Sequence, residues 1–225
     1  MPLAMPSFSP GPTAGTYILE TDGQTRLATM PVEPRSIYGE PIVEGYRLWD
    51  PFRSKLAVLL LKLKGRQDIG LCPDSRVLYL GAATGTTVSH VSDILQEGIL
   101  YAVEFSPRSM RDLLRLTESR KNIVPILADA ARPELYSAIM EPVDMIYQDV
   151  AQRNQAEIAA RNAARYLKPG GTMVLMMKTR SIDVTMPPRE VYAKEIEGLK
   201  GLEILDVLDL LPFHQDHWAV LAKKA

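Results

Sequence analysis

A regular alternation of β-prone and amphipathic segments, which begins at residue 76, constrains the fold of this chain most strongly. Apolar runs that predict strands occur at 76–80, 99–103, 123–127, 143–147, 172–177, 202–208 and 217–222. Apolar residues recur at helical spacing within 87–95, 106–119, 152–167 and 188–198. This order predicts an α/β fold with a parallel, doubly wound sheet and helices on both faces. Because no helix separates the last two strands, we expect one of them to run antiparallel.

The residues before this region divide into an arm and a small β unit. Residues 1–13 contain four prolines and one glycine, so we expect a flexible Pro-rich arm. Asp22-Gly23 separates two β-prone runs, which predicts a hairpin within a small β appendage at 14–45. The main domain then occupies 46–225, where Asp50-Pro51 begins its first helix.

The formal charge is nearly balanced, with 26 Lys and Arg residues against 27 Asp and Glu residues. A protein that binds nucleic acid unaided usually has a strong basic excess, so such a role here needs local basic patches or partners. The single cysteine excludes an internal disulfide, and the three histidines are too scattered to predict a metal site. The apolar runs are too short for a membrane span and no signal peptide is apparent, so we expect a soluble intracellular protein without membrane contacts.

The first strand of the alternating region runs into a loop of small residues, from Gly81 to Thr87. Residues such as Ala83 let the backbone approach a ligand, and the next helix presents its N-terminal N–H groups there. The spacing Gly81-x-x-x-Gly85 lacks the third glycine of dinucleotide sites. Acidic residues stand at the ends of the next three strands, at Glu104, Asp129 and Asp149. This pattern favours S-adenosylmethionine over a dinucleotide; the alternative is a tight β–α turn without a ligand.

Four polar residues lie where a substrate would meet that cofactor: Lys55, Asp149, Lys178 and His217. Taken singly, each lysine is most simply interpreted as a solvated side chain and each histidine as structural. The same applies to His90, outside this set, which we interpret as a polar residue on a helix face. Together they suit methyl transfer to a ribose 2′-hydroxyl, a weak acid that needs a base or an oriented lone pair. A lysine can serve if a neighbouring cation lowers its pKa.

Five segments of the chain resemble fibrillarin: 46–56, 77–90, 101–106, 147–152 and 212–217. The resemblance implies a class I S-adenosylmethionine-dependent methyltransferase (Rossmann-like) fold behind a small N-terminal β domain. It also implies a Lys-Asp-Lys-His catalytic set at the four residues above. We expect Lys178 to act as base or to orient the hydroxyl, Asp149 to anchor the lysines, Lys55 to supply charge and His217 to orient.

The resemblance further implies which residues bind S-adenosyl-L-methionine and which partners assemble with the chain. Together with the loop residues Gly81, Ala83 and Gly85, the implied cofactor contacts are Thr86, Thr87, Glu104, Phe105, Asp129, Ala130, Asp149, Val150, Ala151 and Gln152. The implied partners are a Nop-family scaffold protein, a kink-turn-binding protein and a box C/D guide RNA. The guide pairs with rRNA or tRNA and so selects the nucleotide to be methylated.

Basic residues form candidate RNA contacts at Arg53, Arg108, Arg111 and Arg180, with Arg120 near the helix that carries two of them. Each of these also reads as a solvated helix face. The chain departs from the family pattern at Thr84, where serine is usual, and at His214, where an acid is common. It carries a short Pro-rich arm in place of the long Gly/Arg-rich region of eukaryotic members, so we expect an archaeal-type, cytoplasmic protein.

Two other functions stay open at this level. An ordinary class I methyltransferase for a protein or small molecule would not require the Lys-Asp-Lys-His set and would work without guide RNA. A non-catalytic subunit of an RNA–protein particle would not require an intact cofactor loop.

Overall fold

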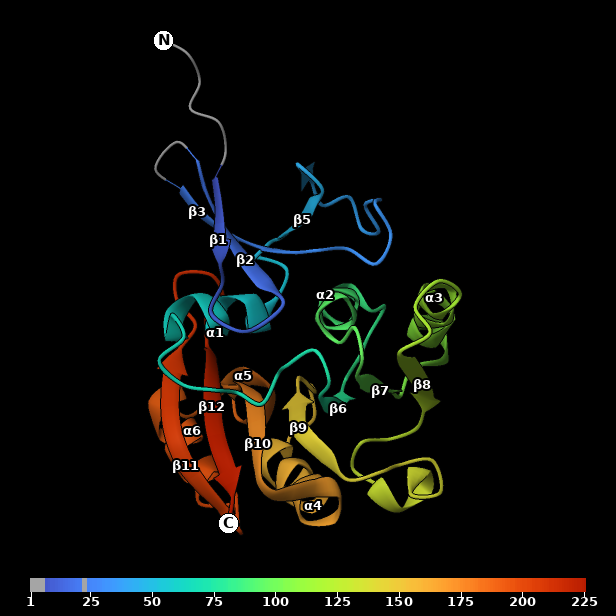
Figure 1. Cartoon of the computed structure of the whole chain (residues 1–225). Coiled ribbons are helices and arrows are strands. Elements are labelled where there is room, and N and C mark those ends of the chain that lie inside the picture. The colour runs from blue at the N-terminus through green and yellow to red at the C-terminus, as the bar shows by residue number, and fades with distance from the viewer. Residues whose placement is uncertain (1–6, 22–23) are drawn as a thin grey trace.

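The computed structural model describes residues 7–21 and 24–225. Within these ranges the larger sheet has seven strands in the order β11-β12-β10-β9-β6-β7-β8 (Figure 1). They are β6 (Arg76–Leu80), β7 (Ile99–Glu104), β8 (Ile123–Leu127), β9 (Val143–Gln148), β10 (Leu167–Lys178), β11 (Leu202–Asp209) and β12 (His217–Lys224). Parallel pairing from β8 to β10 confirms the predicted doubly wound sheet. The predicted antiparallel strand is β12, which opposes both of its neighbours.

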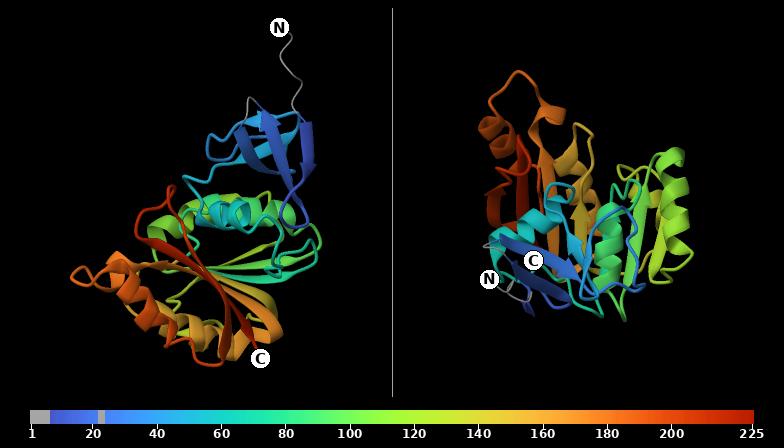
Figure 2. Two further views of the ribbon diagram at one scale, coloured as in Figure 1. Left: turned by 90° about the vertical axis from the view of Figure 1, so that its left-hand side faces the viewer. Right: turned by 90° about the horizontal axis from the view of Figure 1, so that it is seen from above.

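Helices cover both faces of this sheet (Figure 2). One face carries α1 (Lys55–Leu63), α2 (Thr86–Ile94) and α3 (Pro107–Thr117), and the other carries α4 (Gln155–Tyr166) and α6 (Pro188–Ile196). Val77 and Tyr79 of β6 pack into the core on the α1 side, whereas Leu78 and Leu80 pack on the α4 side. Successive strand side chains point to opposite faces, so a sheet covered on both sides needs a continuously apolar strand.

A second, antiparallel sheet lies above α1 and α2 in Figure 1, with strands in the order β1-β2-β3-β5-β4. These strands are β1 (Ser7–Pro10), β2 (Thr16–Thr21), β3 (Gln24–Thr29), β4 (Ile42–Val43) and β5 (Tyr46–Trp49). The register of β2 with β3 pairs Glu20 with Thr25, which confirms that the two runs form an antiparallel pair. The predicted Asp22-Gly23 turn and residues 1–6 of the predicted arm lie outside the described residues.

Two boundaries predicted for this region were wrong. Part of the expected 1–13 arm forms β1, which pairs with β2 alone at the edge of the sheet. An edge strand tolerates Pro10 because one side of its backbone needs no partner. In addition, β5 pairs with β3 and β4, so the small sheet extends to Trp49 instead of ending at residue 45.

Short elements and exact ends in the main domain also differ from the prediction. Two short helices, η1 (Pro133–Tyr136) and α5 (Thr179–Ile182), were not predicted. Helix α4 begins at Gln155 and not at residue 152, and Leu167 already belongs to β10. The register of β10 against β9 shifts between Leu167 and Thr172, where the Pro-Gly-Gly sequence interrupts regular pairing.

A buried ion cluster, formed by Glu40, Arg47, Asp93 and Arg120, joins the small sheet to the main domain. Arg120 Nη1 lies 2.6 Å from Asp93 Oδ1, and Arg47 lies 3.3 Å from Asp93 Oδ2 and 3.2 Å from Glu40 Oε1. Arg120 is therefore not the surface cation that the sequence suggested. His90, interpreted from the sequence as a polar residue on a helix face, is likewise buried and stacks on Trp49 with ring centroids 4.8 Å apart.

Candidate active site

The loop after β6 lies directly against the end of β9. A Cβ atom added to Gly81, whose φ is +86°, would stand 2.3 Å from the carbonyl oxygen of Asp149. The backbone amides of Gly81 and Ala82 both donate to the carbonyl of Val103, each at 3.0 Å. Only glycine fits this close approach, which brings the carboxyl ends of β6, β7 and β9 to one place.

Glu104 shapes the same loop. Its Oε2 accepts a 2.7 Å hydrogen bond from the backbone N–H of Ala83, which has a left-handed φ of 50°. Its Oε1 accepts a 2.7 Å bond from the N–H of Ser106 at the start of α3. Each carboxylate oxygen keeps a further lone pair, so Glu104 can also accept hydrogen bonds from two hydroxyls of a ligand.

The N-terminus of α2 completes the loop. Gly85, at φ +98°, occupies the N-cap position and offers no side-chain cap, so backbone N–H groups at Thr86 and Thr87 can reach a ligand. The Thr87 hydroxyl instead donates to Ser54 Oγ at 3.0 Å, which ties α2 to the N-cap of α1.

The remaining predicted cofactor contacts extend along the same sheet edge. Phe105 is 70 % exposed, so one ring face is available for stacking on a flat ligand. Asp129 Oδ1 accepts hydrogen bonds from the Ala131 N–H at 2.9 Å and from Gln152 Nε2 at 3.1 Å. The buried Gln152 Oε1 has no partner among the described residues, and it is an acceptor that a ligand amino group would satisfy.

Lys55 and Asp149 form an ion pair at this edge, with Lys55 Nζ 2.7 Å from Asp149 Oδ2. Their side chains are 19 % and 25 % exposed, so water screens the pair only partly. Lys55 begins α1, and Asp149 follows β9, with its backbone N–H bonded to the Leu80 carbonyl at 2.9 Å. Two distant parts of the chain thus bring the predicted cation and carboxylate into contact.

Lys178 and His217 are cross-strand partners at the ends of β10 and β12. The buried side chain of Gln155 holds the Lys178 backbone on both sides: its Oε1 accepts from the Lys178 N–H at 3.0 Å, and its Nε2 donates to the Lys178 carbonyl at 3.3 Å. No sequence feature pointed to Gln155, because a glutamine in the first turn of a helix gives no signal of a long-range contact.

The imidazole of His217 has a defined tautomer. Its Nδ1 lies 2.6 Å from the Gln215 carbonyl, and a carbonyl can only accept, so Nδ1 carries the proton. Burial lowers the pKa of His217, and the nearby Lys55 ammonium also lowers it, although the hydrogen bond to Gln215 and the Asp149 charge oppose them. His217 is therefore neutral at pH 7, with an Nε2 lone pair.

His214 has a different position from its neighbour. Its Nε2 donates to the Pro51 carbonyl at 2.8 Å, which ties the loop before β12 to the turn before α1. This bond gives His214 a structural role in holding the two loops together.

The candidate RNA contacts do not form one patch. Arg180, on α5, lies 3.3 Å from Asp216, whereas Arg53 donates to the Tyr38 carbonyl at 2.8 Å. Arg108 and Arg111 are exposed on α3, which packs at the β8 edge of the large sheet, whereas α5 follows β10, an interior strand (Figure 1). The structure therefore separates the α3 arginines from Arg180.

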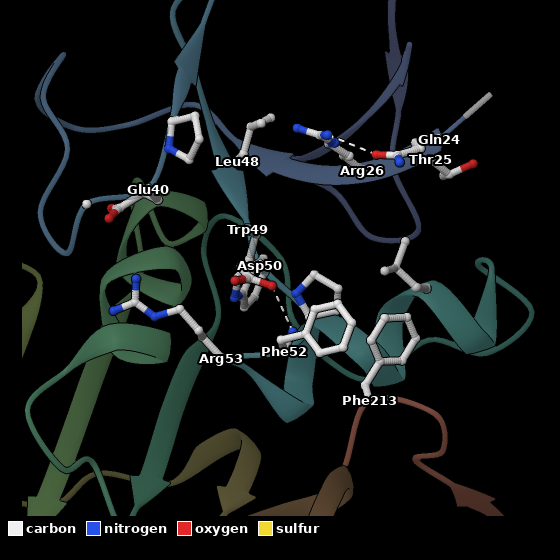
Figure 3. A pocket seen from close by; sticks show the side chains of 14 residues that line it. Gln24, Thr25, Arg26, Glu40, Leu48, Trp49, Asp50, Phe52, Arg53 and Phe213 are labelled. Carbon is white, nitrogen blue, oxygen red and sulfur yellow. Dashed lines mark hydrogen bonds between the residues drawn. The ribbon is translucent and has the colours of Figure 1, made fainter. Parts of the chain in front are cut away.

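A cavity of about 580 Å³ lies between the small sheet and the turn before α1 (Figure 3). Phe52 and Phe213 face one another there, with ring centroids 5.0 Å apart. None of the predicted cofactor contacts lines this cavity. In the part of the chain that the structure describes, no three His, Cys, Asp or Glu side chains gather as a metal site. No helix there has the length and apolar character needed to cross a bilayer.

The sheet order and the loop geometry define the class of fold. The chain shares its fold with an S-adenosylmethionine-dependent O-methyltransferase from Thermotoga maritima, at 12 % identity and a TM-score of 0.55, over 92 % of this chain and 77 % of that one. This is the class I methyltransferase fold, here with an added N-terminal antiparallel sheet.

A family model described as Fibrillarin matches residues 11–225, and the chain belongs to the fibrillarin family. It is 59 % identical to the fibrillarin-like rRNA/tRNA 2′-O-methyltransferase of Methanothrix thermoacetophila, over 93 % of this chain and 96 % of that protein. Aeropyrum pernix fibrillarin, solved with natively bound S-adenosyl-L-methionine, shares 47 % identity and a TM-score of 0.86, over 96 % and 97 % of the two chains. A chain in a fibrillarin/Nop5p complex shares 45 % identity and a TM-score of 0.87, over 95 % and 99 %.

Proposed function

We propose that this chain transfers methyl groups from S-adenosylmethionine to ribose 2′-hydroxyls of rRNA and tRNA, as the catalytic subunit of a guide-RNA-directed box C/D ribonucleoprotein. One observation carries the proposal: Asp149, which pairs with Lys55, also lies directly against Gly81 of the candidate cofactor loop. The named activity of the Methanothrix thermoacetophila relative supports the same chemistry.

The residues along the sheet edge suit this cofactor. Glu104 would accept hydrogen bonds from the two ribose hydroxyls, Phe105 would pack against the adenine, and Asp129 with Gln152 would receive the adenine amino group. The cradle at Gly81, which a Cβ would fill, and the unpartnered Gln152 Oε1 fit such a ligand. When bound, S-adenosylmethionine supplies an electrophilic methyl group on a sulfonium.

In this mechanism Lys178 removes the proton from the 2′-hydroxyl or orients its lone pair. Asp149 fixes the Lys55 ammonium, which supplies positive charge at the site. The imidazole of His217 is neutral, and its Nε2 accepts a hydrogen bond from the amino group of Lys178, which orients that lysine. Holding the hydroxyl in line with the methyl group contributes to the rate alongside proton removal.

The assembly supplies substrate recognition. We propose a Nop-family scaffold, which the complex of the similar fibrillarin with Nop5p supports, together with a kink-turn-binding protein and a guide RNA. The nearly balanced charge of the chain agrees with a subunit that does not hold RNA alone. We also propose a cytoplasmic location for this archaeal-type protein.

The test is methylation of a guide-matched RNA with radiolabelled S-adenosylmethionine, by the chain alone and by the reconstituted assembly. We expect one methylated nucleotide, at the position the guide selects, only in the full assembly. Methylation of the same RNA by the chain alone would contradict the role of the partners. Methylation of a protein or small molecule without RNA would favour an ordinary class I methyltransferase.

A further inference from the structure

Tyr38, in the loop between β3 and β4 of the small sheet, contacts the candidate cofactor loop. Its hydroxyl donates a hydrogen bond to the backbone carbonyl of Thr84. The same hydroxyl lies so close to Gly85 that a Cβ there would be 3.0 Å from it. Burial, and secondarily the charge of Asp112, raises the pKa of Tyr38 to about 12, so the hydroxyl keeps its proton at neutral pH.

The backbone of Tyr38 is held in place by Glu40. The Glu40 carboxylate accepts from the Tyr38 N–H at 2.7 Å and from the Ile37 N–H at 3.2 Å. Arg47 of β5, whose side chain is wholly buried, contacts the same carboxylate at 3.2 Å. The buried ion cluster therefore connects the backbone of Tyr38 to the small sheet, and this connection fixes the position of the Tyr38 hydroxyl.

A second connection from Arg47 reaches the other side of Gly85. Arg47 Nη2 donates to Ser89 Oγ at 2.8 Å, and Ser89 Oγ donates to the Thr86 carbonyl at 2.7 Å. The C=O and N–H of one peptide unit lie in a single plane, so fixing the Thr84 and Thr86 carbonyls also fixes the amides that follow them. These amides belong to the loop and helix N-terminus of the candidate cofactor site.

We propose that Tyr38 is a positioning residue for the methyl-donor site and that the small sheet serves to hold the cofactor loop in its binding conformation. On the opposite side, Glu104 holds the Ala83 N–H, so the loop is fixed from two directions. Left-handed backbone at Ala83, a residue with a Cβ, is costly to maintain without such contacts. The inference rests on the proposed S-adenosylmethionine site and assigns it a residue outside the methyltransferase sheet.

The test compares Tyr38→Phe with Tyr46→Phe in the full chain. Both variants lose one tyrosine hydroxyl from the small sheet, and the Tyr46 hydroxyl makes no hydrogen bond among the described residues. Calorimetric titration with S-adenosylmethionine gives Kd, and amide hydrogen exchange without ligand gives the protection of residues 82–87. We expect Tyr38→Phe to raise Kd by about five- to tenfold and to accelerate exchange in the loop, because one hydrogen bond is lost.

Turnover separates positioning from general destabilisation. In the reconstituted assembly, Tyr38→Phe should raise KM for S-adenosylmethionine and leave kcat at saturating cofactor unchanged, as for Tyr46→Phe. An unchanged Kd in Tyr38→Phe, or an equal rise in Tyr46→Phe, would overturn the inference. Unaccelerated loop exchange would overturn it as well. Failure of the wild-type chain to bind S-adenosylmethionine would instead refute the proposed function.

Discussion

The two lysines at the candidate site have different electrostatic surroundings. Lys55 is paired with Asp149, with Nζ 2.7 Å from Oδ2. Lys178 is exposed, and no carboxylate lies within ion-pair distance of it among the described residues. Lys178 is therefore the lysine whose amino group is not occupied by an ion pair among the described residues. This difference supports assigning proton removal to Lys178 and a charge role to Lys55.

Replacement of Lys178 by alanine tests that assignment. We expect Lys178→Ala to lower kcat in the reconstituted assembly by about a hundredfold or more, because a positioned base contributes on that scale. The Kd for S-adenosylmethionine should stay within about twofold, since Lys178 has no hydrogen bond or ion pair with the loop residues that we propose to hold the cofactor. The matched control is Lys168→Ala, at the other end of β10 and paired with Asp144. Undiminished methylation by Lys178→Ala would refute the role.

Gln155 offers a second test at this scale. Gln155→Met keeps the approximate volume of the side chain but removes both hydrogen bonds to the Lys178 backbone. We expect kcat to fall by about tenfold, since small displacements of reacting groups are costly, while the Kd for S-adenosylmethionine is unchanged. Steady-state kinetics and calorimetry measure the two quantities, and Gln96→Met on the surface is the control. Equal kcat for both variants would show that Gln155 does not position Lys178.

At the scale of elements, the alternation of strands and helices was predictable because each element is encoded locally. Apolar runs fixed β6 to β10, and parallel topology alone then places Glu104 and Asp149 at one sheet edge. Helix ends and short elements such as α5 depend on contacts that a single sequence does not display. Gln155 and Tyr38 escaped prediction for the same reason, because each acts on a segment far away in the chain.

The packing of α2 against the small sheet predicts a pH effect. Burial lowers the pKa of His90 well below its ordinary value of 6.5, and the charges of Arg47 and Arg120 lower it further. Below pH 6.5 the unfolded state therefore binds a proton that the folded state does not, so stability falls as pH falls. The contribution of neutral His90 to stability is therefore complete above pH 6.5 and is lost progressively as the pH falls below it.

Urea unfolding of the wild type and of His90→Gln at several pH values between 7.5 and 5 measures this effect. We expect the free energy of unfolding to fall more steeply with decreasing pH in the wild type than in His90→Gln. The reason is that the wild type takes up one additional proton, at His90, when it unfolds. His214 and His217 also have lowered pKa values, so a shallower slope remains in the variant. Identical slopes would contradict a neutral, buried His90.

For the whole molecule, the count of 26 basic residues against 27 acidic ones overstates how many cations are available to bind RNA. Arg47 and Arg120 are buried in the ion cluster, and Lys55 and Lys168 are paired with aspartates. The exposed arginines of α3 lie at the β8 edge of the sheet, whereas Arg180 on α5 follows the interior strand β10. A short RNA held by phosphate contacts needs several cations along one path, so this surface alone predicts weak binding.

Salt dependence separates Arg180, beside Lys178, from arginines elsewhere on the surface. Arg180 is 46 % exposed in its pair with Asp216, and Arg161 on α4 is 47 % exposed in its pair with Glu134, so Arg161→Ala is a matched control. If Arg180 contacts a phosphate in the assembly, Arg180→Ala should weaken binding of guide-matched RNA and reduce the slope of log K against log salt by about one. Arg161→Ala should leave both unchanged. Equal slopes for the two variants would place the substrate phosphates away from α5 and shift the search for RNA contacts to Arg108 and Arg111.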